Sequence, residues 1–223
     1  MPLTAPRPLV WPIVNQHLED AAFCWLRRSE ALWLPVMRTE HLQRIDRQLD
    51  AHLCGLRIAG APALARAQSH LERWETADEV FVSTYVALHA GGEAESFAPI
   101  ETLLLEDEEL APGAAAALLW AGPRTALPLM QRWWLSGEPA LRRAALPASL
   151  RHPQVSRENA ILDSLESSYA PLVARALRAI GEWALRQHQP ALESALHAGD
   201  ARCRLEAAYA LRLFGHDVGM PDL

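Results

Sequence analysis

Lysine is absent from this sequence of 223 residues, so all 21 of its lysine-or-arginine positions are arginine. The absence excludes catalysis through a lysine Schiff base and the lysine-bearing phosphate loop. Arginine favours planar, bidentate and stacked contacts of the kind found at protein interfaces. The net charge is −6, which argues against a protein whose main role is to coat nucleic acid, because phosphate neutralisation supplies most of that affinity.

Cysteine is scarce and long apolar runs are missing. Cys24, Cys54 and Cys203 form no C-x-x-C pair, so neither a disulfide framework nor a zinc knuckle is expected. Cys24 and Cys54 lie within apolar helical patterns, which predicts buried free thiols. No run could cross a bilayer, and the stretch 9–14, broken by proline, is too short for a signal-peptide core. We therefore expect a cytoplasmic protein that does not bind membranes.

Motifs of catalysis and metal binding are also missing. The sequence has no G-x-S-x-G turn, no glycine-rich phosphate loop and no H-E-x-x-H pair among its nine histidines. The acidic cluster at residues 106–109 is typical of a solvated loop, and ion-paired faces explain the other carboxylate pairs better than acid–base catalysis does. We expect a protein that is not an enzyme and holds no cofactor and no metal.

Helical periodicity dominates the chain, and the alternation typical of β-strands is nearly absent. Prolines are expected to start or stop helices. Helices are predicted over about 13–34, from 39 to a glycine-marked end at 55–60, over 62–74, and over about 97–106. The run 80–86 is rich in β-branched and aromatic residues, as strands are. A capping box formed by Thr76 and Glu79 precedes this run, which favours a helix instead.

Four alanine-rich helices repeat in the second half of the chain. Their ends at Gly122, Leu150, Gly181 and Gly215 recur at the length of a helix-hairpin repeat, and shorter helices lie between them. Each hairpin has an apolar face that only a stacked neighbour can bury. The pattern resembles HEAT-like repeats. The predicted fold is all-α, with a helical N-terminal region over residues 1–110 and a short α-solenoid of HEAT-like hairpins over 111–223; an irregular helical bundle is the alternative.

Eight tryptophans are present, and most are expected in the core. Trp133 and Trp134 are adjacent, so on a helix they point about 100° apart. Either one of them is exposed beside Arg132, ready to anchor a partner, or the two bridge successive core layers. Arginines on the repeat helices add positive charge to what could be one face. The candidate partner-binding residues are Arg132, Trp133, Trp134, Arg142, Arg143, Arg175 and Arg178.

Two segments near the N-terminus carry a family resemblance. Residues 17–27 (HLEDAAFCWLR) and 42–60 (LQRIDRQLDAHLCGLRIAG) resemble the opening of a bacterial family of HEAT-like repeat proteins. That family is often associated with type VI secretion gene clusters, and its pattern carries no catalytic residues. The signature positions are Glu19, Trp25, Arg27, Asp46, Arg47 and His52. We favour a structural role for them, in holding the first two helices together, over a partner site.

The resemblance implies a role linked to secretion. The leading hypothesis is a non-catalytic protein-binding adaptor or co-chaperone that helps to dock an effector, its chaperone or a spike component. An immunity protein that blocks a toxin is the first alternative, and the acidic charge suits it if the toxin is a nuclease. A HEAT-like enzyme of the bilin lyase or DNA glycosylase type is the second. The missing active residues argue against a lyase, and the charge argues against a glycosylase.

Overall fold

The computed structural model describes residues 9–32 and 34–218 and confirms the all-α prediction. Twelve α-helices and two short 3-10 helices account for the regular structure of these residues, and no strand occurs among them. Of the helices described, none is long and apolar enough to cross a membrane. The chain divides into two compact units, residues 1–103 and 104–223. This division falls inside α5 (Ala94–Glu106), seven residues before the boundary between 110 and 111 that the sequence predicted.

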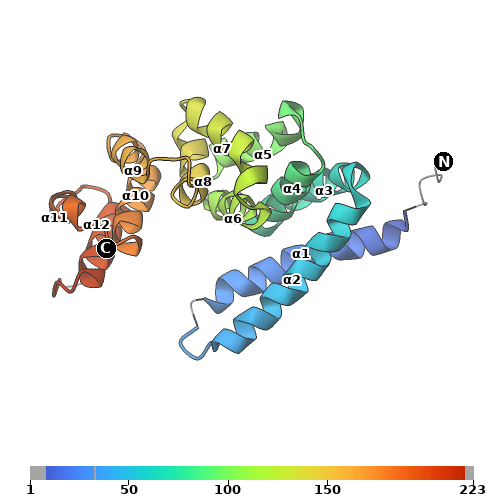
Figure 1. The fold of residues 1–223 in the computed structure, drawn as a ribbon, viewed down its shortest axis with the longest axis horizontal. Helices are drawn as coiled ribbons and strands as arrows, with labels where there is room; N and C mark the ends of the chain where they lie inside the picture. The colour runs from blue at the N-terminus through green and yellow to red at the C-terminus, as the bar shows by residue number, and fades with distance from the viewer. Residues whose placement is uncertain (1–8, 33, 219–223) are drawn as a thin grey trace. The chain divides into compact units, whose positions relative to one another are not determined.

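The first unit is built on four helices: α1 (Trp11–Ala31), α2 (Thr39–Ala59), α3 (Ala61–Trp74) and α4 (Ala77–His89). α1 and α2 pack along one another as a long hairpin, while α4 packs on both α1 and α3 (Figure 1). α1 ends at Ala31, three residues before the predicted end, and Trp33 lies outside the described residues. Proline in the first turn favours the start of α1 and α3, because its missing N–H has no helical partner there.

In α4, residues that usually favour β-strands form a helix whose side chains are buried. The β-branched run 80–86 is helical as predicted, and every residue from Glu79 to Ala87 is buried. Phe81 stacks on Trp25 of α1 with ring centres 5.5 Å apart, which ties α4 to the first hairpin. The predicted capping box is wrong. The Thr76 side chain makes no capping hydrogen bond, and Glu79 is buried instead of reaching back to the N-cap.

The second unit has two layers of helices, which confirms the predicted hairpin repeats. The first layer consists of α6 (Ala111–Ala121), α8 (Pro139–Ser149), α10 (Ala170–Glu182) and α12 (Ala201–Leu213), each packed on the next. The second layer consists of α7 (Pro123–Leu135), α9 (Arg157–Leu165) and α11 (Gln189–Ala195), each packed on first-layer helices. The 3-10 helices Glu108–Leu110 and Arg186–His188 complete the unit. This alternation is that of an α-solenoid.

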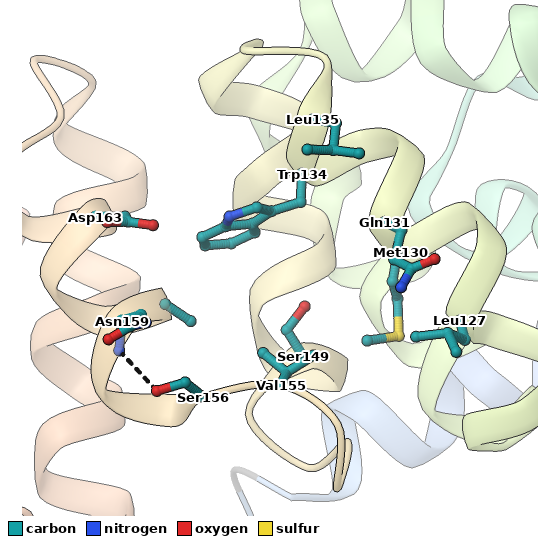
Figure 2. Close-up of a pocket in the computed structure, with 11 residues that line it drawn as sticks. Leu127, Met130, Gln131, Trp134, Leu135, Ser149, Val155, Ser156, Asn159 and Asp163 are labelled. Atoms are coloured by element: carbon teal, nitrogen blue, oxygen red, sulfur yellow. Dashed lines mark hydrogen bonds between the residues drawn. The ribbon is translucent and has the colours of Figure 1, made fainter.

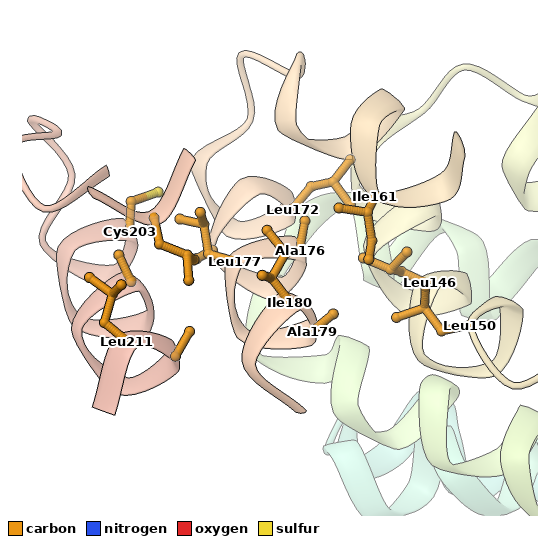
Figure 3. Packing of buried hydrophobic residues seen from close by; sticks show 14 of the residues in the cluster. Leu146, Leu150, Ile161, Leu172, Ala176, Leu177, Ala179, Ile180, Cys203 and Leu211 are labelled. Atoms are coloured by element: carbon orange, nitrogen blue, oxygen red, sulfur yellow. The ribbon is translucent and has the colours of Figure 1, made fainter. Parts of the chain in front are cut away.

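Small residues let the first-layer helices approach closely. In Figure 3, Leu146, Leu150 and Ile161 lie on one side of α10, while Cys203 and Leu211 of α12 lie on the other. One close approach is at Gly181, where an added Cβ would lie 2.7 Å from the Cα of Ala210 in α12. A side chain at this position would therefore push α10 and α12 apart.

Two expectations from the sequence are wrong. Prolines do not only bound helices, because Pro99, Pro128 and Pro147 lie inside α5, α7 and α8. Each removes one backbone donor from its helix, so packing of the helix must offset that loss. Cys54 is exposed and not buried, because Leu49, Leu53 and Leu56 form the buried face of α2 and Cys54 lies beside that face, whereas Cys24 is buried as expected.

Candidate functional site

A groove of about 510 Å³ lies in the second unit between α7 and α9 (Figure 2). Its size is in the range of sites that hold a small ligand or a few side chains of a partner. Residues from α7, from the end of α8, from the turn before α9 and from α9 (Arg157–Leu165) line it. They are Leu127, Met130, Gln131, Trp134, Leu135, Ser149, Val155, Ser156, Asn159, Ala160 and Asp163.

The floor of the groove is apolar and its rim is polar. Met130 and Ala160 are buried at the floor, while Leu127 and Val155 form half-buried walls. Gln131, Asn159 and Asp163 are exposed at the rim and offer amide and carboxylate groups. An apolar floor with a few polar groups around it is typical of binding sites.

The connection between α8 and α9 fixes the lower edge of the groove. Arg157 donates from Nε to the carbonyl oxygen of Leu150 at 2.5 Å, and its guanidinium carbon lies 4.0 Å from the ring centre of Trp183. The buried His152 accepts a hydrogen bond from the backbone N–H of Gln154 at 3.2 Å. These contacts hold residues 151–156 in a turn, so Val155 and Ser156 face the groove from a fixed position.

The two adjacent tryptophans have different environments. Trp133 is fully buried in the core, whereas Trp134 is half-buried and projects into the groove toward α9 (Figure 2). Trp134 also packs against the core cluster around α10, so it bridges the groove and the next layer. Both interpretations of the sequence thus hold in part for Trp134. Trp133 is not a surface anchor.

Arginines cover most of the tryptophans outside the core. Only two of the seven tryptophans in the described part of the chain, Trp25 and Trp133, are buried, so the expectation that most are core residues is wrong. Arginine guanidinium groups lie 4.0–5.7 Å from the ring centres of four others. These four are Trp11, Trp74, Trp134 and Trp183. A weakly hydrated, planar cation suits an aromatic face, so half-exposed rings are stabilised without burial.

The candidate arginines of α7 and α8 have different roles. Arg142 contacts a groove residue directly, because its Nε donates to the carbonyl oxygen of Trp134 at 3.0 Å. Arg143 instead donates to the carbonyl oxygen of Glu108. Arg132 is half-buried near the end of α7. Of these three arginines, Arg142 is therefore the one with a described hydrogen bond to a residue that lines the groove.

The acidic cluster at residues 106–109 is not simply a solvated loop, which corrects the expectation from the sequence. The Glu108 carboxylate lies 2.5 Å from the guanidinium of Arg202 on α12. That hydrogen bond is the main cause of a lowered pKa at Glu108. The cluster therefore takes part in the packing of the second unit through Glu108.

Arg175 and Arg178 do not present unpaired positive charge, which corrects the expectation of a cationic face on α10. Glu182 accepts hydrogen bonds from both, at 3.1 Å from Arg175 and 2.9 Å from Arg178. Arg178 also reaches Glu206 of α12 at 3.3 Å. Two arginines and two glutamates make a neutral group, so these side chains join α10 to α12.

Three signature positions of the first unit hold its helices together. Asp46 of α2 accepts a 2.7 Å hydrogen bond from Arg28 of α1, as an ion pair between the two helices. His52 of α2 lies 3.1 Å from His17 of α1, measured between the Nδ1 atoms. Trp25 stacks on Phe81 of α4. These contacts support the structural role that the sequence favoured for Trp25, Asp46 and His52.

The other three signature positions are exposed. Arg27 lies against the Phe23 ring with its guanidinium carbon 5.6 Å from the ring centre, and Arg47 faces solvent on α2. Glu19 lines a second cavity, in the first unit. No group of three histidine, cysteine or carboxylate side chains within the described ranges is arranged to hold a metal ion.

The fold and the groove together define a two-layer helical-repeat protein with an apolar surface site. Comparisons with the models of known protein families, with curated proteins and with solved structures gave no match. No sequence signal pointed to Met130, Asn159 or Asp163 as groove residues, because the groove depends on how α9 is placed after the turn at 151–156.

Proposed function

We propose that the protein is a non-catalytic adaptor whose α7–α9 groove receives apolar side chains of a partner protein. The observation that carries the proposal is the position of Trp134, which is held at the edge of an open apolar groove by Arg142. Tryptophan and arginine in a partly closed pocket are the residues that most often dominate binding energy at interfaces. Leu135, 82% exposed, extends the apolar surface beyond the groove.

The groove suits an amphipathic helix of the partner. Such a helix would place one or two apolar side chains over Met130 and Ala160 at the floor. Asp163 carries the negative charge at the rim, so a basic residue of the partner would pair with it. Gln131 and Asn159 offer hydrogen bonds to polar residues that flank the inserted side chains.

The resemblance of the N-terminal segments supports a secretion-linked setting for this adaptor. The partner would then be an effector, its chaperone or a spike component. A toxin would be the partner if the protein were an immunity protein, and the same groove would serve that role. The absence of recognisable catalytic motifs in the sequence supports a binding function over an enzymatic one.

Affinity capture from the native cells tests the proposal and separates the two kinds of partner. The tagged wild-type protein is compared with the variant Asn159→Trp, which places a large side chain at the exposed rim of the groove, and with Leu213→Trp at an exposed site on α12. An adaptor should recover a chaperone, effector or spike component with the wild type and the Leu213 variant only. Recovery of a toxin alone identifies the immunity role. Equal recovery by all three proteins, or no specific recovery, contradicts the groove as the binding site.

A further inference from the structure

A second cavity, of about 410 Å³, lies in the first unit between α1 and the junction of α3 with α4. This cavity shares no residue with the α7–α9 groove, so a ligand could bind here whether or not the protein is an adaptor. Eight described residues line it, of which three carry carboxyl groups and none is basic. They are Glu19, Ala22, Phe23, Leu26, Trp74, Thr76, Asp78 and Glu79.

Glu79 is the unusual member of this lining. It is 6% exposed, and its Oε2 atom has no hydrogen-bond partner among the described residues. Nδ1 of His70 lies 3.8 Å from Oε1, which is beyond hydrogen-bond distance. A buried carboxylate without a partner is costly, so a protein that retains one has a use for it or must keep it protonated.

The surroundings of Glu79 disfavour its charged form. Burial raises the pKa of Glu79 to about 7, and the negative charges of Asp78 on α4 and Glu19 on α1 add to that effect. Burial also lowers the pKa of His70 on α3. The charge of Glu19 opposes this effect and those of Arg66 and Arg73 add to it, so the net shift is downward and His70 supplies little compensating charge at neutral pH. A cation placed between these carboxyl groups would stabilise the ionised form of Glu79.

Apolar and aromatic side chains make up the rest of the wall. Three exposed side chains line the cavity together with its carboxyl groups. They are Phe23, Leu26 and Trp74. Arg27 and Arg73, close to these rings in sequence, already place their guanidinium carbons 5.6 and 4.8 Å from the centres of the Phe23 and Trp74 rings, so a guanidinium group is compatible with such a wall. A compact, strongly hydrated metal ion or ammonium would gain little from an apolar wall. A guanidinium group on an aliphatic stem can interact both with the carboxyl groups and with the apolar and aromatic side chains.

We propose that this cavity binds the guanidinium group of an arginine side chain presented by another protein. The carboxylates of Glu79, Glu19 and Asp78 take the charge, and the side-chain stem packs on Leu26 and Trp74. Binding shifts the protonation equilibrium of Glu79 toward the carboxylate, so a proton leaves Oε1 or Oε2 for solvent as the arginine enters. The affinity therefore increases as the pH rises through about 7.

Isothermal titration calorimetry with a blocked tripeptide that has a central arginine tests this site on the full chain. The matched probe is the same tripeptide with citrulline, which keeps the shape and loses the charge. We expect the arginine probe to bind at least about tenfold more tightly than the citrulline probe at pH about 8. Titrations at pH about 7 in two buffers of different ionisation enthalpy should show release of roughly half a proton.

Two variants assign the binding to this cavity. Glu79→Gln should weaken the arginine probe about tenfold and abolish the proton release, while Glu30→Gln, an exposed acid elsewhere on α1, should change neither. Trp74→Ala, at an exposed position, should weaken binding severalfold without unfolding the protein. Absence of binding at millimolar probe, equal binding of citrulline, or unchanged binding by Glu79→Gln in a folded protein overturns the proposal and leaves the α7–α9 groove untouched.

Discussion

The guanidinium carbon of Arg142 lies 5.7 Å from the centre of the Trp134 ring, and the same side chain donates to the Trp134 carbonyl oxygen at 3.0 Å. One residue of α8 thus holds both the backbone and the ring of a residue of α7. The two contacts restrict Trp134 to a position at the edge of the groove. An anchor that is ordered before binding loses less conformational entropy when the partner arrives.

Removal of this contact should destabilise the second unit slightly. Arg142→Ala loses a hydrogen bond and a cation–π contact, so the free energy of unfolding should fall by about 1–2 kcal/mol. Arg124→Ala, an exposed arginine at the start of α7, is the control and should change the value by less than about 0.5 kcal/mol. Urea unfolding followed by circular dichroism measures both. Equal effects of the two substitutions would show that Arg142 does not hold Trp134.

Substitution of the two neighbouring tryptophans should separate stability from binding. Trp133→Ala removes a fully buried side chain, and we expect a loss of about 3–5 kcal/mol in the free energy of unfolding. Trp134→Ala removes a half-buried ring, so its loss should be clearly smaller, about 1–2 kcal/mol, while partner capture should be lost. Denaturant unfolding and affinity capture on the same preparations give the two readouts. If Trp134→Ala retains full capture, the ring is not an anchor.

The pKa of Glu79 predicts how stability depends on pH. The folded-state pKa of about 7 lies above the ordinary value of 4.5, so the folded protein binds this proton more tightly than the unfolded chain does. The stabilisation is complete below pH about 4.5 and is lost as the pH rises through about 7, a change of about 3 kcal/mol. His70 opposes this trend below pH about 6.5, because its folded-state pKa is lowered.

Glu79→Gln isolates the contribution of this carboxyl group. The variant should be more stable than the wild type at pH about 8, by up to about 3 kcal/mol, and the two should converge toward pH about 5. Urea midpoints across this pH range provide the measurement, with Glu30→Gln as the exposed control on α1. A wild type that gains stability between pH about 6.5 and 8 would contradict the assignment of a raised pKa to Glu79.

The close approach of α10 and α12 depends on a glycine. Gly181→Ala places a Cβ 2.7 Å from the Cα of Ala210 and 2.8 Å from its Cβ, so the helices must separate. Alanine is the better helix former by about 1 kcal/mol, but overpacking against backbone costs about 1–3 kcal/mol and should prevail. Gly199→Ala, in the bend before α12 where nothing lies within 4 Å of the added Cβ, is the control for the added methyl group. Thermal unfolding should show a lower midpoint for Gly181→Ala only.

The sequence predicted the helices and the repeats because these depend on local signals. Apolar spacing, first-turn prolines and the glycines after α2 and α6 are read directly from the chain, and stacking of the hairpins follows from their unpaired apolar faces. The sequence predicted that Trp133 and Trp134 point in different directions, but not which of the two is buried. Their divergence follows from the helical repeat, but the rotation of α7 about its axis, set by packing on α6 and α8, decides which one is buried.

The environment of Glu79 could not be predicted from the sequence. The pattern Thr76-x-x-Glu79 also fits a capping box, and only the packing of α4 between α1 and α3 turns the carboxyl group inward. The arginine that pairs with Asp46 could likewise not be predicted from the sequence. Arg47 is adjacent in sequence, but the α1–α2 hairpin brings Arg28 across to within 2.7 Å. Tertiary placement outweighed sequence proximity in both cases.

Site-specific photo-crosslinking in the native cells tests most directly whether the α7–α9 groove binds a partner protein. A photoreactive phenylalanine replaces Leu135 at the rim in one protein and the exposed Leu213 of α12 in another. We expect one dominant crosslinked protein from position 135, lost when Trp134→Ala is added, and none from position 213. No specific crosslink at position 135, or the same products from both positions, would contradict the groove as the binding site.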